Sequence, residues 1–321
     1  MRSVSTLIKT IATIAITALL TTLAVLLTIG YITCTHSKAS GRNGGGSGSM
    51  SNGGAQEYIV EDASTTGCIV YIDNANQMYY STGSVDLPGA TSYTFWSCVG
   101  TGNPTASGFI TSFDCSNSGH GNKLISLNVG GLTNLKSLFC AFNELTSLNV
   151  NGLTNLQDFD CHSNQLISLD ATGCSNLKCL LCGFNPLTAL NLSGCTSLQF
   201  LACFSTQLTS LNISQHKSLE SFFCGFNQLL TSINADGCAS LREICCTLNP
   251  LLTSLSVSGC TSLQSLNCGM NQLTSLNVSG LTGLQELDCM FNQFGSIDIT
   301  GCNRLSKTDF SHNPNLQIVG P

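Results

Sequence analysis

The residues best suited to chemistry in this chain are its 19 cysteines and five histidines. Thiolates act as nucleophiles and metal ligands, and two cysteines three positions apart are typical of redox sites and of half a zinc site. Cys179 and Cys182 have this spacing, and Cys245 and Cys246 are adjacent. If these segments are strands, the two sulfurs of each pair point to opposite faces of a sheet. Both pairs are therefore interpreted as accidental matches.

No other arrangement of residues indicates catalysis. The histidines share no spacing suited to a metal site, and neither a glycine-rich phosphate loop nor a G-x-S-x-G nucleophile turn is present. The histidines are His36, His120, His162, His216 and His312. We therefore expect a non-enzymatic protein with no cofactor and no metal ion.

Most of the cysteines belong to a repeated unit. Residues 135–155 read LKSLFCAFNELTSLNVNGLTN, and residues 156–176 read LQDFDCHSNQLISLDATGCSN. The unit recurs to the C-terminus, mostly in steps of 21 or 22 residues, which is the signature of a solenoid. The cysteine column consists of Cys115, Cys140, Cys161, Cys182, Cys203, Cys224, Cys246, Cys268 and Cys289, with Phe310 in the tenth place.

Two further columns keep the same period. Asparagine follows three residues after the cysteine, and we expect its side chain to turn inward and bond backbone groups of its own and the next coil. This column consists of Asn143, Asn164, Asn185, Asn227, Asn249, Asn271, Asn292 and Asn313, with Thr206 as the exception. A third column holds leucine, cysteine or His216 in the turn before each new coil.

The pattern LxxLxCxxNxLxxLxVxGLxN resembles the leucine-rich repeat family, and in particular its short-repeat secreted bacterial members, with internalins as distant relatives. The resemblance extends from about residue 110 to residue 318. Each coil has two short runs, LxxLxC and LTSLNV, and neither is long enough for an independent helix. The predicted fold is a mostly β solenoid of about ten coils, with parallel strands stacked coil on coil and little or no helix on the convex side.

Disulfides within the cysteine column are not expected. Coils stack at about 4.8 Å with parallel side chains, whereas a disulfide needs Cβ atoms about 3.8 Å apart and a twisted torsion. The column is therefore predicted to hold free, buried thiols that pack as small apolar groups. Cys68 and Cys98 lie outside the columns, and they are the pair favoured for a disulfide.

Five segments precede or form the repeats: a short flank at 1–10, an apolar run at 11–32, a Gly/Ser-rich linker at 33–55, a small β-rich cap at 56–108 and the solenoid at 109–321. As a helix, the apolar run would be about 33 Å long, which is enough to cross a bilayer core. A membrane anchor with the repeats outside the cell is favoured. The alternative is a signal cleaved at the small-x-small site Ser37-Lys38-Ala39, which would release a secreted protein.

Candidate binding residues lie on the concave face, where neighbours of the inward side chains of LxxLxC point outward. Central coils place large apolar residues there, with acids towards both ends, and a contiguous apolar patch usually marks an interaction site. The candidate ligand-binding residues are Phe139, Leu181, Phe200, Phe204, Phe223, Asp160, His162 and Asp288. The alternative is that the rings pack on one another.

The charge and polarity of the sequence limit the classes of partner that it can bind. Only 9% of residues are charged and the net charge is −6, so no basic surface for nucleic acid is indicated. A protein partner is expected first and a glycan second, bound in recognition or adhesion at the cell surface. A structural surface or virion component that uses the solenoid as a rigid spacer is the alternative. A flat Ser/Asn array on the second strand, which would order water as ice-binding solenoids do, ranks third.

Overall fold

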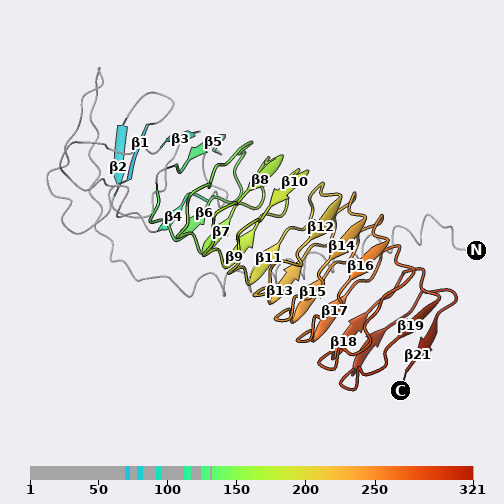
Figure 1. Ribbon diagram of the computed structural model, residues 1–321. Coiled ribbons are helices and arrows are strands. Elements are labelled where there is room, and N and C mark those ends of the chain that lie inside the picture. The colour runs from blue at the N-terminus through green and yellow to red at the C-terminus, as the bar shows by residue number, and fades with distance from the viewer. Residues whose placement is uncertain are drawn as a thin grey trace, which may run out of the picture. The chain divides into compact units, whose positions relative to one another are not determined.

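The computed structural model describes residues 69–72, 78–81, 92–94, 112–116, 124–130 and 132–320. Its main feature is a ten-stranded parallel sheet, called here the long sheet, with one strand from each coil (Figure 1). Its strands are β4 (Ser112–Asp114), β6 (Ser137–Phe139), β7 (Asp158–Asp160), β9 (Cys179–Leu181), β11 (Phe200–Ala202), β13 (Ser221–Phe223), β15 (Glu243–Cys245), β17 (Ser265–Asn267), β18 (Glu286–Asp288) and β20 (Lys307–Asp309).

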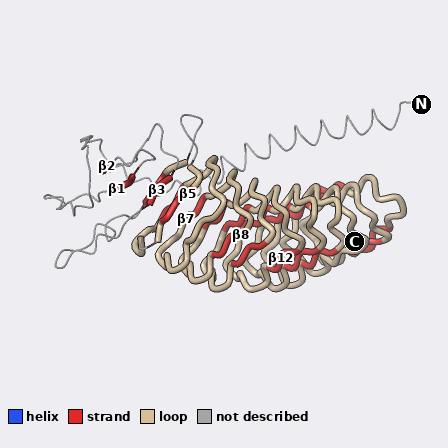
Figure 2. Tube along the Cα trace, turned by 90° about the horizontal axis from the view of Figure 1, so that it is seen from above, coloured by secondary structure: helices blue, strands red, loops and turns tan. Residues whose placement is uncertain are grey.

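The other half of the coil contributes shorter parallel sheets. These join β8 (Ser168–Asp170) to β10 (Ala189–Asn191), β12 (Ser210–Asn212) to β14 (Ser232–Asn234) and β16 (Ser254–Ser256), and β19 (Ser296–Asp298) to β21 (Gln317–Val319). Figure 2 shows strands on both sides of one continuous coil joined by loops. Residues 132–320 contain no helix, so the expected mostly β solenoid, with two short strands in most coils, is confirmed.

Strand pairing follows the repeat without a shift in register. Phe159 lies opposite Leu180, and Leu180 lies opposite Leu201, so each residue pairs with its equivalent in the next coil. A slip by one residue would move every inward side chain to the outside, so the alternation of apolar and polar residues holds this register. The steps of 21 and 22 residues therefore become straight columns of like side chains.

The core is filled by leucine and cysteine columns. Leu138, Leu180 and Leu201, the central residues of their strands, are fully buried. Cys140, Cys161, Cys182, Cys203, Cys224, Cys246, Cys268 and Cys289 are also fully buried, and none of the described cysteines forms a disulfide. The Sγ atoms of Cys268 and Cys289 lie 3.6 Å apart, well beyond a covalent S–S bond. The prediction of free, buried thiols is confirmed for the column, except that Cys115 in the first coil is only partly buried.

The asparagine column bonds backwards along the solenoid. Asn271 Nδ2 donates to the carbonyl of Cys268 in its own coil at 2.8 Å and to the carbonyl of Cys246 in the preceding coil at 2.9 Å. Its Oδ1 accepts the backbone N–H of Asn249, also in the preceding coil, at 2.9 Å. The expectation that the side chain bonds backbone groups of the next coil was therefore wrong. The asparagine side chain bonds its own coil and the coil before it.

A second column of thiols closes the opposite turn. Cys195 Sγ donates to the carbonyl of Ala171 at 3.3 Å, and Cys260 Sγ donates to that of Ala235 at 3.2 Å. His216 occupies this column where other coils have cysteine or leucine, and its Nδ1 lies 3.2 Å from the carbonyl oxygen of Cys195. These side chains join each turn to the coil before it.

Three strands are described before the repeats. β1 (Ile69–Ile72) and β2 (Met78–Ser81) form an antiparallel pair, and β3 (Ser92–Thr94) pairs in parallel with β5 (Ser126–Asn128). The apolar run at 11–32, the linker at 33–55, Cys68 and Cys98 lie outside the described residues. In the part of the chain that is described, no helix has the length and apolarity needed to span a bilayer.

Candidate binding face on the long sheet

The outward face of the long sheet is formed by the first and third residues of each strand and by the residue that follows the column cysteine. In β7, Phe159 is inward and fully buried, while Asp158 and Asp160 on either side of it are partly exposed. This alternation follows directly from strand geometry. It brings side chains from successive coils to a spacing of about 4.8 Å.

The structure brings together the central aromatic residues of this face. The ring centroids of Phe200 and Phe223 lie 5.3 Å apart, and those of Phe204 and Phe184 lie 5.0 Å apart in an edge-to-face arrangement. Phe204 also covers Gly183, since a Cβ added at that glycine would lie 2.9 Å from the phenylalanine ring. The phenylalanine rings in the middle of the outward face therefore pack against one another.

This packing corrects the expectation of an exposed aromatic patch. Phe200 and Phe204 are each 7% exposed and Phe223 is 4% exposed. The sequence showed that these rings share a face, but it did not show that rings in adjacent coils cover one another. Of the predicted apolar residues, Phe139 and Leu181 remain partly exposed.

Carboxylates dominate the remainder of the outward face. In strands β6 to β20 they are Asp158, Asp160, Glu243, Glu286, Asp288 and Asp309, and within the described strands of the long sheet Lys307 is the only lysine or arginine. Lys307 pairs with Glu286. Desolvation raises the pKa of Asp158, Glu243 and Asp288, because burial disfavours the charged form of a carboxyl group. Asp158 and Asp288 are partly buried, and Glu243 is exposed. Asp158 accepts a hydrogen bond from the hydroxyl of Ser137, and Asp288 accepts one from the backbone N–H of Met290.

Asp160 and His162 form a fixed pair on this face. Nδ1 of His162 lies 2.6 Å from Oδ1 of Asp160, which also accepts the backbone N–H of His162 at 3.1 Å. The imidazole packs edge-on against Phe142 at a centroid distance of 4.5 Å. Its Nε2 is buried and has no hydrogen-bond partner in the described structure. Asp288, the other predicted acid, lies six strands further along the sheet, far from this pair.

One edge of the outward face is formed by residues with left-handed backbone conformation, called here the αL column. Their φ values lie between 52° and 61°, a region in which side chains cost about 1 kcal/mol or more each. The column consists of Phe142, Ser163, Phe184, Ser205, Phe226, Leu248, Met270, Phe291 and His312. Each residue precedes the column asparagine or Thr206, so the turn imposes this conformation on every coil.

The αL column leaves apolar surface accessible beside the acids. Phe142 is 45% exposed, and Phe226, Leu248 and Met270 are half-buried. Within this column, the rings of Phe291 and His312 stack at a centroid distance of 3.9 Å. The residue types gave no sign of positive φ, because glycine and asparagine are the usual occupants of that region.

The thiols of this face do not form a reactive or metal-binding group. Cys179 is 5% exposed, and Cys245 is partly buried with its Sγ 3.8 Å from Oγ1 of Thr247. Burial raises the pKa of Cys245, so its thiol is protonated at neutral pH. Among the described residues, no cluster of three or more His, Cys, Asp or Glu side chains has a metal-binding arrangement.

The fold defines a class: this protein is a leucine-rich-repeat solenoid with repeats of 21–22 residues. No model of a protein family matches the sequence, and no curated protein matches it. Among solved structures, it is similar to the functional domain of InlJ from Listeria monocytogenes, described as including a cysteine ladder, at 30% identity and a TM-score of 0.59. That match covers 66% of this chain and 46% of the InlJ domain, so the chain spans about half the length of that relative.

Other matches have lower similarity. The internalin InlF of Listeria monocytogenes is 18% identical with a TM-score of 0.33, and the match covers 67% of this chain and 83% of that one. The effector protein YopM of Yersinia pestis is 23% identical with a TM-score of 0.38, and the match covers 58% of this chain and 65% of that one.

Proposed function

We propose that this protein recognises a protein partner through the outward face of the long sheet, and that the contacting surface of the partner is rich in lysine and arginine. The observation that carries the proposal is the charge of this face, which has six carboxylates and one lysine in strands β6 to β20. A cationic partner would offset these charges.

Desolvation supports this choice of partner. Asp158 and Asp288 are partly buried, and desolvation raises the pKa values of both and of Glu243 because the charged form loses hydration. A lysine or arginine placed beside them would favour the charged form and would gain charge-assisted hydrogen bonds. Complementary charge of this kind increases the association rate and selects against acidic partners.

The apolar part of the surface supports a protein rather than a small ion. Phe142 is 45% exposed, Phe139 in the same coil is partly exposed, and so is Leu181 two coils further on. Partly exposed aromatic side chains beside charged groups are typical of contact surfaces between proteins. The strands that carry them are held by continuous backbone pairing, so binding would cost little conformational entropy.

Selection of binders from a random peptide display library tests the proposal, with the full chain as bait. Enrichment of peptides that contain Lys or Arg together with aromatic or aliphatic residues is expected. Their binding should weaken about tenfold or more in the double variant Asp160→Asn/Asp288→Asn, which corresponds to about 1.4 kcal/mol.

The matched control removes the same charge from the other half of the coil. Asp170→Asn/Asp298→Asn keeps the side-chain oxygen that accepts a turn N–H at each position, as Asn277 does in its own coil. Equal weakening by the two double variants would contradict the proposed face. Selected peptides without basic residues would contradict the proposed partner, and failure to select any peptide would favour the rigid-spacer function.

We further propose that the repeats lie outside the cell, tethered by residues 11–32 or released after cleavage near Ala39. The supporting observation is the apolar run itself, followed by the Gly/Ser-rich segment at 40–55. N-terminal sequencing of the mature protein separates the two forms. Protease digestion of intact cells should degrade the repeats in the tethered form, and full protection would contradict an external location.

A further inference from the structure

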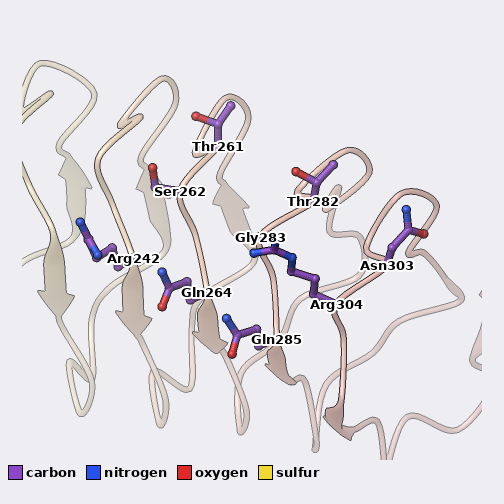
Figure 3. Close-up of a pocket in the computed structure, with 9 residues that line it drawn as sticks. All are labelled: Arg242, Thr261, Ser262, Gln264, Thr282, Gly283, Gln285, Asn303 and Arg304. Atoms are coloured by element: carbon purple, nitrogen blue, oxygen red, sulfur yellow. The ribbon is translucent and has the colours of Figure 1, made fainter.

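A second surface is distinct from the outward face. It is a groove of about 490 Å³ beside the turns that lead into the last strands of the long sheet (Figure 3). We call it the arginine groove, and its lining residues are Arg242, Thr261, Ser262, Gln264, Thr282, Gly283, Gln285, Asn303 and Arg304. Sequence reasoning did not identify any of these residues as candidates.

Three of the lining side chains form a regular row. Arg242, Gln264 and Gln285 directly precede β15, β17 and β18, so they hold the same position in three successive coils. The backbone N–H of Gln264 donates to the carbonyl of Arg242, and that of Gln285 donates to the carbonyl of Gln264, both at 2.8 Å. One guanidinium group and two amide groups therefore stand side by side at about the coil spacing of 4.8 Å. All three residues are exposed.

The second arginine enters the groove from the next coil. In Figure 3 the side chain of Arg304 extends back towards Gly283, so its guanidinium group lies beside the preceding coil. Other coils have serine at the position of Gly283, as at Ser262 and Ser240. A Cβ added at Gly283 would lie 3.2 Å from the carbonyl oxygen of Leu263. The missing side chain leaves room beneath Arg304.

Neither guanidinium group is neutralised within the groove. Arg242 has an exposed contact with Glu220, from Nε to Oε2 at 3.5 Å, and exposed pairs of this length contribute little. No ion pair of Arg304 is found among the described residues. The nearest strand carboxylates, Glu243 and Glu286, belong to the long sheet, where Lys307 pairs with Glu286.

The chemistry of the lining points to a particular class of ligand. It consists of two guanidinium groups, three amides, three hydroxyl groups and one glycine, without an apolar or acidic side chain. Guanidinium groups bind carboxylates and sulfates through paired N–H donors, and amides and hydroxyl groups both donate to and accept from sugar hydroxyls. A peptide ligand would also need apolar pockets for its anchoring side chains.

From this arrangement we infer that the arginine groove binds an acidic oligosaccharide, a chain of sugars bearing carboxylate or sulfate groups, laid across successive coils. Arg304 and Arg242 contact the acidic groups, and Gln264 and Gln285 contact hydroxyls between them. The site is independent of the protein-binding face proposed above, because the two share no side chain and carry opposite charge.

Titration of the full chain with defined oligosaccharides tests the inference. Oligogalacturonate supplies carboxylates without sulfate, a heparin-derived oligosaccharide supplies both, and maltohexaose is the neutral match. Calorimetry should detect binding of at least one acidic probe and none of maltohexaose. Arg304→Gln should weaken acidic binding about tenfold or more, since it removes a charge-assisted pair of hydrogen bonds. Arg304→Lys should recover only part of that loss, because lysine lacks the planar pair of donors.

Two controls separate the groove from general attraction of anions to cations. Lys136→Gln removes an exposed charge from an early coil, at the position that Arg242 holds in its own coil. Lys307→Gln removes an exposed charge from strand β20. Both should change binding less than twofold. Gly283→Ser introduces the residue found in four other coils and should weaken binding several-fold by filling the space under Arg304, while circular dichroism shows that the protein remains folded.

Several outcomes would overturn the inference. These are equal weakening by Lys136→Gln and Arg304→Gln, binding of maltohexaose as tight as that of the acidic probes, and absence of binding to all three probes. An oligoglutamate peptide that binds as tightly as the acidic sugars would also reject the assigned ligand class. Peptide selection on the outward face is unaffected by all of these results, so the two proposals fail separately.

Discussion

The asparagine column should contribute more to the stability of this solenoid than any comparable set of side chains, and Asn271→Ala tests this. The Asn271 side chain is 2% exposed and bonds three backbone groups: the carbonyls of Cys246 and Cys268 and the N–H of Asn249. Alanine would leave the N–H of Asn249 without this acceptor, whereas the carbonyls of Cys246 and Cys268 would lose one donor but keep another, from Asn249 and Asn292. A buried polar group without a partner costs about 1–3 kcal/mol.

One N–H without a partner and two lost amide bonds of about 0.5–1.5 kcal/mol each set the upper range, and relaxation of the turn or entry of a water molecule reduces it. We expect Asn271→Ala to lower the free energy of unfolding by about 3–4 kcal/mol. Because each coil contacts only its neighbours, the effect should appear as reduced cooperativity as well as a lower midpoint. Guanidinium denaturation followed by circular dichroism measures both, as the slope and the midpoint of the transition.

The adjacent exposed residue provides the matched control. Gln272→Ala removes an exposed amide from the same turn and leaves the backbone bond from its N–H to the carbonyl of Leu252 intact. It should change stability by less than about 0.5 kcal/mol. A loss below about 1 kcal/mol for Asn271→Ala, or equal losses for the two variants, would refute the reasoning.

The interruption of the column at Thr206 offers the reverse test. Thr206 is buried and its Oγ1 donates to Oδ1 of Asn227 at 2.7 Å. Thr206→Asn would restore the donors that other coils direct to two carbonyls, and a gain of about 1 kcal/mol is expected. A lower unfolding midpoint would show that the threonine is the better fit to this turn.

Two further predictions follow from burial. Burial lowers the pKa of His216 below its ordinary value of 6.5, so the unfolded chain binds a proton more readily, and stability should fall as pH drops through and below 6.5. His216→Cys should make unfolding midpoints less sensitive to pH between 7 and 5, and parallel profiles for the two proteins would contradict this. Burial raises the pKa of Cys203 to about 12 and that of Cys174 to about 11, so iodoacetamide at pH 8 should leave both unmodified in the folded protein. Peptide mass spectrometry measures the modification, and labelling of Cys203 at the rate of the unfolded chain would refute the prediction.

The sequence by itself determined the fold of the repeats. Columns such as Cys161, Cys182 and Cys203 are in phase only if the chain coils back on itself every 21 or 22 residues, and burial of these thiols agrees with that inference. Local pattern is sufficient here because each coil buries its apolar side chains against the next coil, so the structural information repeats along the chain. The strand positions and the outward direction of Asp160 and Leu181 follow from the same alternation.

Only the tertiary structure decided which outward residues are accessible. Phe200 and Phe223 share a face in the sequence pattern, but their burial depends on ring packing between two successive coils, across 23 positions of sequence. The same holds for the arginine groove, because Arg242 and Arg304 are 62 positions apart and share a groove only through the stacking of coils and the small residue Gly283. Periodicity fixes the direction of each side chain, whereas exposure depends on the size and rotamer of its neighbours in adjacent coils.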